Sequence, residues 1–191
     1  MSTDTPPGFY AARTRAMKRE GVAGWRTAVT LRAGRLAAVG EDGGAIWVDP
    51  ADVARMRVGY EESKRGKHFQ TRIWRTGQLN PLVLHPLTQY DPNYSATIQA
   101  FAAAVAAIGG VGRIERGITA FWAWAGPVLM GLLFLAAAAV GIVVLADHVW
   151  WQRCAVALVP GVLFAVLLWN TLTRLAPRPI VELSELDKQL P

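Results

Sequence analysis

The sequence contains very little cysteine and little charge. Cys154 is the single cysteine among 191 residues, which excludes a disulfide framework within the chain and any zinc or iron–sulfur site built from several cysteines. Charged residues make up 18% of the chain, below the roughly 25% typical of soluble domains, whereas hydrophobic residues reach 52%. This composition is unlike that of a disordered chain or an ordinary soluble domain, and it favours a membrane protein.

Two long stretches in the C-terminal part lack charged residues altogether. As helices, residues 117–146 would extend about 45 Å and residues 154–173 about 30 Å, which is the thickness of a hydrocarbon core. The sequence therefore predicts a hairpin of two transmembrane helices over residues 118–173. Tryptophans lie near the ends of both stretches, where aromatic side chains anchor helices at the membrane interface. These predicted interface residues are Trp122, Trp124, Trp150, Trp151 and Trp169.

Arginines near the two stretches set the predicted orientation. Arg113 and Arg116 precede the first stretch and Arg174 and Arg178 follow the second, while Arg153 alone lies between them. Because positive residues are retained in the cytoplasm, both termini of this multi-pass protein are predicted to be cytoplasmic. The lipid bilayer is then the first expected partner.

Positive charge is concentrated in the N-terminal part. Residues up to Arg116 hold 16 of the 20 lysines and arginines against 10 acidic residues, so the net charge of +6 lies entirely in this part. Anionic lipid headgroups or an acidic protein would both match this charge. Nucleic acid is disfavoured as a partner, since zinc-finger spacing, an RNA-binding aromatic signature and a helix-turn-helix pattern are all missing.

Residues 25–87 alternate between short apolar strands and turns. Six strands are predicted, the first two joined by a hairpin around Gly34, where glycine permits a positive φ. Asp91 and Pro92 then begin a helix whose apolar residues recur at helical spacing. The uncharged residues 92–112 are long enough to be a third membrane span, but their apolar run is short and broken by glycine, which favours a helix closing over the sheet.

The stretches Gly34-Arg35-Leu36-Ala37-Ala38-Val39 and Ile46-Trp47-Val48-Asp49-Pro50-Ala51-Asp52-Val53 resemble bacterial pleckstrin-homology-like (PH-like) membrane proteins. The resemblance covers residues 25–110 and also rests on the order of the strands and the helix. It implies an α+β fold: a small antiparallel β-barrel or bent sheet with a C-terminal capping helix, followed here by the two-helix transmembrane hairpin. It further implies a non-catalytic interaction module, located in the bacterial inner membrane.

Two departures from that family limit what the resemblance implies. The family's barrel has seven strands, one more than the six predicted here. The first hairpin loop has only Arg32 and Arg35, and it lacks the longer basic loop that binds phosphoinositides in eukaryotic relatives. Specific inositide binding is therefore not expected.

The chain divides into five predicted parts. These are a basic N-terminal segment (1–24), a PH-like cytoplasmic domain (25–110), a glycine-containing joint (111–117), the transmembrane hairpin (118–173) and a cytoplasmic tail (174–191). In the first part, residues 9–19 have the pattern of a short amphipathic helix at the membrane interface, and a disordered basic tail fits them as well.

The densest group of positive charges lies in a predicted turn and the strand after it. It comprises Lys64, Arg65, Lys67, Arg72 and Arg75. These residues form the candidate binding surface for anionic lipid or an acidic protein. A solvated surface that keeps a β-rich domain from associating explains them equally well.

No catalytic or metal-binding pattern is found in the sequence. The three histidines lie far apart, and none has a neighbour at metal-ligand spacing. We therefore predict no enzyme activity, no metal and no cofactor. The predicted function is that of a membrane-anchored binding or scaffold module at the cytoplasmic face of the membrane, with a membrane or cytoplasmic protein as its partner. The alternative is an accessory subunit of a larger transporter or membrane enzyme complex.

Overall fold

The chain folds into two compact units. The computed structural model describes residues 8–63, 66–117, 125, 128–136, 139–140, 158–159, 161–170 and 177–191. Unit 1 consists of residues 1–117 together with 177–191, and unit 2 consists of residues 118–176. The two segments of unit 1 are therefore separated in the sequence by the whole of unit 2.

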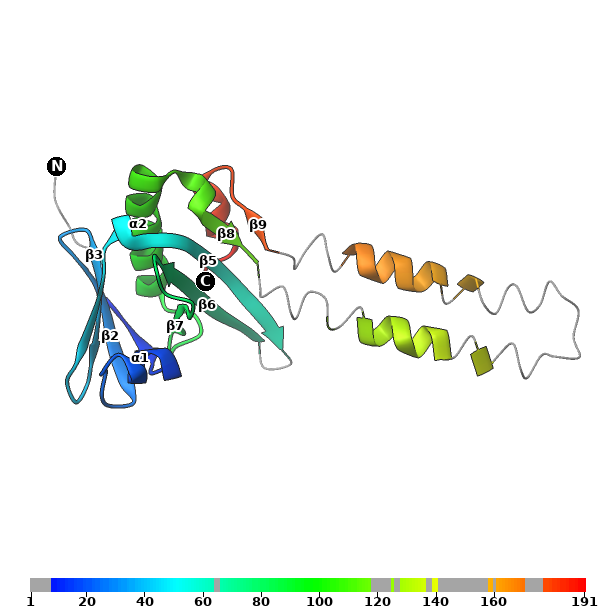
Figure 1. Ribbon diagram of the computed structural model, residues 1–191, viewed down its shortest axis with the longest axis horizontal. Coiled ribbons are helices and arrows are strands. Elements are labelled where there is room, and N and C mark those ends of the chain that lie inside the picture. The colour runs from blue at the N-terminus through cyan, green and yellow to red at the C-terminus, as the bar shows by residue number, and fades with distance from the viewer. Residues whose placement is uncertain are drawn as a thin grey trace, which may run out of the picture. The chain divides into compact units, whose positions relative to one another are not determined.

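Unit 1 is an α+β structure with two β-sheets (Figure 1). The first sheet is antiparallel and has the strand order β1-β2-β3-β4. Its strands are β1 (Phe9–Ala12), β2 (Arg26–Arg32), β3 (Arg35–Gly40) and β4 (Ala45–Val48). The second sheet has the order β7-β6-β5-β8-β9, and β8 runs parallel to β5. Its strands are β5 (Val53–Ser63), β6 (Gly66–Arg75), β7 (Leu82–Leu84), β8 (Ile114–Arg116) and β9 (Arg178–Pro179).

Helices connect the strands of unit 1 and cover its core. The α-helices are α1 (Arg15–Arg19) and α2 (Pro92–Gly109), and the 3-10 helices are η1 (Pro50–Asp52), η2 (Val111–Arg113) and η3 (Leu183–Lys188). The predicted start of α2 is confirmed, because the Asp91 side chain accepts a hydrogen bond from the backbone N–H of Asn93 and Pro92 occupies the first turn. The helix ends at Gly110, whose φ of 81° few other residues adopt.

The six predicted strands correspond to β2 through β7, but the sequence prediction missed β1. The sequence predicts a short helix or a basic tail for residues 9–12, whereas they pair antiparallel with β2 in the register Phe9↔Val29. In β1, Phe9 and Ala11 are buried while Tyr10 is exposed, which is the alternation of a strand. Four residues are too few for this period to be distinguished from a helical one in the sequence.

A two-residue turn joins β2 to β3. Ala33 and Gly34 have φ values of 47° and 77°, and two positive φ values are the mark of the hairpin turn that matches strand twist. The turn sets Arg32 opposite Arg35 at the end of the ladder. The positive φ predicted for Gly34 is confirmed.

A single core lies between the two sheets and α2, and Tyr94 of α2 contacts both sheets. Its ring packs edge-on against Phe9 of β1, with the ring centroids 4.9 Å apart. Its hydroxyl oxygen lies 2.7 Å from Oγ1 of Thr71 in β6, and both residues are fully buried. Burial raises the pKa of the Tyr94 phenol, so the hydroxyl stays protonated and keeps this hydrogen bond. One helix therefore holds the two sheets in a defined relation.

The C-terminal residues 177–191 belong to unit 1. β9 pairs antiparallel with β8, and three apolar side chains of the segment enter the core: Ile180, Leu186 and Leu190. Polar contacts hold the same segment to α2, since Ser95 Oγ donates to the carbonyl of Pro191 at 3.0 Å and Gln99 Nε2 donates to Asp187 Oδ1 at 2.8 Å. The end of the chain is thus an integral part of the domain.

The prediction of a single barrel or bent sheet is corrected to two sheets. Among the described strands, ladders join β1 to β4 in one sheet and β5 to β9 in the other. The break falls at η1, where the Asp49 side chain accepts a hydrogen bond from Ala51 N and Pro50 has no N–H to donate to a ladder. The strands β8 and β9, added by the segments on either side of unit 2, were not predicted.

The predicted transmembrane hairpin over residues 118–173 is wrong. Within the part of the chain that the structure describes, no helix combines the length and the apolar character needed to cross a bilayer. Residues 128–136 and 161–170 are helical. The absence of charge makes a stretch apolar enough for a bilayer and does not by itself specify a helix of spanning length. The rest of the predicted spans, such as residues 141–157, lies largely outside the described residues.

The predicted location in the membrane is wrong for the same reason as the predicted hairpin. A multi-pass protein of the bacterial inner membrane, with both termini in the cytoplasm, requires helices that cross the bilayer, and the described residues contain none.

Candidate functional site

The outer face of the second sheet carries arginines from two neighbouring strands. In β5, Met56 and Val58 are fully buried, so the alternation of a strand places Arg55 and Arg57 on the opposite face. In β6, Thr71 and Ile73 are fully buried and alternate with Arg72 and Trp74. Arg72 and Trp74 therefore lie on the same outer face as Arg55 and Arg57.

The register of the sheet brings these side chains together. Arg55 pairs with Trp74, and Arg57 pairs with both Arg72 and, across the parallel ladder, Glu115 of β8. We call these five residues the arginine face. Three guanidinium groups and one carboxylate thus lie on adjacent strands of one sheet.

Glu115 is the counterion of Arg57. Nε and Nη2 of Arg57 both donate to Oε2 of Glu115, at 2.8 and 2.7 Å, while Nη1 of Arg55 lies 3.9 Å from Oε1. Arg57 is only 8% exposed, whereas Arg55 remains partly open to solvent. Because charge-assisted hydrogen bonds are strong in partly buried surroundings, the Glu115 carboxylate mainly neutralises Arg57.

Trp74 holds the guanidinium of Arg55 over its ring. The Arg55 guanidinium carbon lies 4.0 Å from the ring centroid and that of Arg57 lies 5.2 Å from it. This cation–π contact fixes the direction of a long side chain while leaving its N–H groups available at the surface. Arginine beside a partly exposed tryptophan is also the composition found at binding hot spots.

Arg72 is the least compensated cation of the arginine face. Within the described residues, its hydrogen bonds go only to the neutral side chain of Gln70, whose Oε1 accepts from Nε at 3.2 Å and from Nη2 at 3.1 Å. Burial lowers the pKa of Arg72, the Arg57 guanidinium lowers it further, and Glu61 acts in the opposite direction. An arginine remains charged at neutral pH despite such shifts, so its unfavourable surroundings would improve with a bound anion.

His85 lies within electrostatic reach of this cation. Burial, and after it the Arg72 charge, lowers the pKa of His85, while a hydrogen bond with the backbone of Phe69 opposes the shift. The imidazole is therefore neutral at physiological pH and adds no positive charge to the arginine face.

The structure separates the residues of the predicted basic cluster. Lys64 and Arg65 lie outside the described residues. Arg72 is on the arginine face, whereas Arg75, three residues along the strand, is on the opposite face and forms an ion pair with Glu20 beside α1. Lys67 places its ammonium nitrogen 4.5 Å from the ring centroid of Tyr60. Among the described members of the predicted cluster, Arg72 and Arg75 therefore do not share one surface.

Of the predicted interface tryptophans, only Trp169 is described. It lies in the helical residues 161–170 and is 74% exposed. Trp122, Trp124, Trp150 and Trp151 lie outside the described residues.

Sequence reasoning missed Arg55, Arg57, Trp74 and Glu115. A period of two was visible in Arg55–Arg57 and in Arg72–Trp74, and it would have placed each pair on one strand face. The sequence gives no such signal for Glu115, because its strand has only three residues and lies far from its partner strand β5 in the sequence.

The arginine face can bind an anionic group by charge and by hydrogen bonds from N–H donors. Among the described residues there is no group of three or more histidine, cysteine, aspartate or glutamate side chains placed to hold a metal ion. No family model matches this chain, and no curated protein and no solved structure is similar to it beyond chance. The function must therefore be inferred from the site itself.

Proposed function

We propose that this protein is a non-catalytic binding module, and that the arginine face receives an acidic segment of a protein partner. The observation that carries the proposal is the Arg72 guanidinium, which is half-buried beside a second arginine and hydrogen-bonded, within the described residues, only to a neutral amide. A carboxylate of a partner would supply the missing counterion.

The charge of unit 1 supports an acidic partner. Residues 1–117 and 177–191 contain 18 lysines and arginines against 13 acidic residues, a net charge of +5. A positive field of this kind steers negatively charged partners towards the surface and accelerates their association. Trp74 adds an apolar contact next to the cations, which is the usual composition of a protein-binding surface.

The order of elements supports the resemblance to PH-like interaction modules. Seven strands, β1 through β7, precede α2, which is the number expected for that family and one more than the sequence indicated. The parallel strand β8 and the returning strand β9 are additions to that plan. The proposal of a binding module therefore rests on two independent features, the strand order and the arginine face.

Removal of the Arg72 charge is expected to weaken binding of an acidic segment. In the full chain, Arg72→Gln should lower the affinity for a fluorescein-labelled oligoglutamate peptide by about 1 kcal/mol, or roughly fivefold, since a partly exposed charge pair contributes no more than this. Fluorescence anisotropy at low salt measures the effect, and added salt should reduce it.

The matched control for this measurement is Arg32→Gln. Arg32 is an exposed arginine at the end of β2, in the other sheet, and its removal changes the net charge by the same amount. Affinity should be nearly unchanged in this variant. Equal losses in both variants would show that binding depends on net charge alone and would contradict the proposal.

A second candidate function, an accessory subunit of a larger protein complex, is favoured by the surface of unit 2. Many apolar side chains of its helical residues are exposed; among them are Leu129, Leu132, Leu163, Val166 and Trp169. Exposed apolar surfaces of this kind mark interaction sites. We expect the full-length protein to copurify with a larger protein in fixed stoichiometry, and purification of the chain alone as a monodisperse species would exclude this role.

A further inference from the structure

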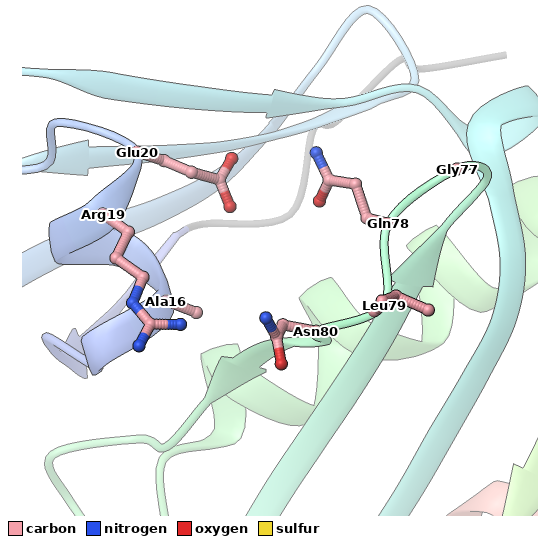
Figure 2. A pocket seen from close by; sticks show the side chains of 7 residues that line it. All are labelled: Ala16, Arg19, Glu20, Gly77, Gln78, Leu79 and Asn80. Atoms are coloured by element: carbon pink, nitrogen blue, oxygen red, sulfur yellow. The ribbon is translucent and has the colours of Figure 1, made fainter.

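A pocket of about 380 Å³ opens between α1 and the turn that connects β6 to β7 (Figure 2). It is separate from the arginine face, because its lining residue Glu20 pairs with Arg75, which lies on the opposite face of β6. The residues that line it are Ala16, Arg19, Glu20, Gly77, Gln78, Leu79 and Asn80. Its volume is that of a site for a small ligand or for one or two residues of a peptide.

The walls of the pocket are held in place before any ligand binds. Met17 is fully buried and anchors α1 to the core, and Glu20 at the end of α1 pairs with Arg75 of β6. On the opposite wall, the backbone N–H of Gln78 donates to the carbonyl of Arg75 at 3.0 Å and closes the turn. Such preorganisation reduces the entropy lost when a ligand is bound.

The polar side chains in the pocket are two charged groups, of Arg19 and Glu20, and two neutral carboxamides, of Gln78 and Asn80. Figure 2 shows the side chains of Glu20 and Gln78 facing one another across it, with Arg19 and Asn80 also directed into the space between α1 and the turn. Because Glu20 is neutralised by Arg75, the net charge offered to a ligand is that of Arg19. Arg19 makes no ion pair within the described residues.

The two carboxamides, of Gln78 and Asn80, present both a donor and an acceptor, which is the complement of a peptide group. Arg19 presents only donors, with a geometry that matches a carboxylate. Leu79 is 95% exposed at the edge of the pocket, where a neighbouring apolar side chain would cover it.

We propose that this pocket binds a carboxylate joined to a peptide group, with Arg19 as its counterion and the carboxamides of Gln78 and Asn80 hydrogen-bonded to the adjoining peptide bond. The carboxylate comes either from the free C-terminus of a partner chain or from an aspartate or glutamate within it. This site is separate from the arginine face and does not depend on the function proposed for that face.

Amide NMR of the full chain distinguishes the two sources. The probes are N-acetyl-alanyl-leucine with a free carboxylate, its C-terminal amide, and the amide of N-acetyl-aspartyl-leucine. The backbone amide signals of Gly77 to Asn80 should shift with one or both acids and not with the amide of alanyl-leucine. Binding of the first acid alone assigns a C-terminal carboxylate, binding of the third probe alone assigns an acidic side chain, and binding of both shows that the pocket accepts a carboxylate from either source. Equal shifts with all three probes, or none with any, would overturn the proposal.

The role of Arg19 is tested by a pair of variants on the same helix. Arg19→Gln should weaken binding of the acidic probe by up to about fivefold, since an exposed charge pair contributes about 1 kcal/mol or less. Arg15→Gln removes the same charge from an exposed position that does not line the pocket and should bind as the natural chain does. Equal affinities of these two variants would contradict the proposal.

A variant of the arginine face keeps the two sites distinguishable. Arg72→Gln should leave the shifts of Gly77 to Asn80 unchanged, whether or not it alters oligoglutamate binding. Loss of these shifts in Arg72→Gln would mean that the probes bind the arginine face, and it would overturn the assignment to this pocket.

Discussion

Replacement of Leu186 by alanine is expected to destabilise unit 1 by about 2–5 kcal/mol, the cost of emptying a core leucine site. Leu186 lies in η3, after unit 2 in the sequence, and yet it is only 1% exposed within the core of unit 1. Hydrogen exchange of the amides of α2 measures the loss, because this helix contacts η3 and reports on unit 1 alone.

The control for this prediction is Leu79→Ala. Leu79 is the same residue type at an exposed position of unit 1, and its truncation should change stability by no more than about 0.5 kcal/mol. If Leu186→Ala left the exchange of α2 as slow as in this control, residues 177–191 would not belong to the folded core of unit 1.

Substitution of Glu115 by glutamine is the second change expected to have a large effect. It removes the carboxylate that accepts two hydrogen bonds from Arg57 and leaves that buried guanidinium without a counterion. Breaking a buried pair by removing one partner costs about 3–5 kcal/mol, and the lower end applies here because the Glu115 side chain is still 20% exposed. Urea unfolding of the full chain, followed by the exchange of β5 amides, measures the loss.

Two further variants isolate the cause of this destabilisation. The double variant Arg57→Met with Glu115→Leu removes both charges, and it should recover much of the lost stability because no unpaired charge stays buried. Asp49→Asn breaks the ion pair of Asp49 with Arg35, which is far more exposed, and should cost less than about 1 kcal/mol while asparagine retains the cap of η1. Equal costs for Glu115→Gln and Asp49→Asn would show that burial of Arg57 does not matter.

The candidate site shows which parts of a function local sequence can predict. The predicted cluster from Lys64 to Arg75 was based on charges that are close together in the sequence. Side chains on a strand alternate between two faces, however, so Arg72 and Arg75 lie on opposite faces of β6. The residues that share the arginine face with Arg72 come from β5 and β8 as well as β6. Their proximity depends on strand register, which no single segment specifies.

The same distinction explains the two errors over fold and location. Hydropathy counts apolar residues in a stretch, and it predicted spans over residues 118–173 from their length alone. Among the described residues, no helix has both the length and the apolar character that a bilayer requires. No local pattern reports that Ile180 and Leu190 find their apolar partners in a core formed by residues 9–117.

Local patterns were sufficient for the strands β2 to β7, for the turn at Gly34 and for the limits of α2, because backbone propensities, caps and the two-residue period act between near neighbours. Tertiary structure alone decided that β1 joins β2, that β8 and β9 extend the second sheet from either side of unit 2, and that Glu115 meets Arg57. Those contacts join residues far apart in the chain, and their free energy appears only when the core that aligns them has formed.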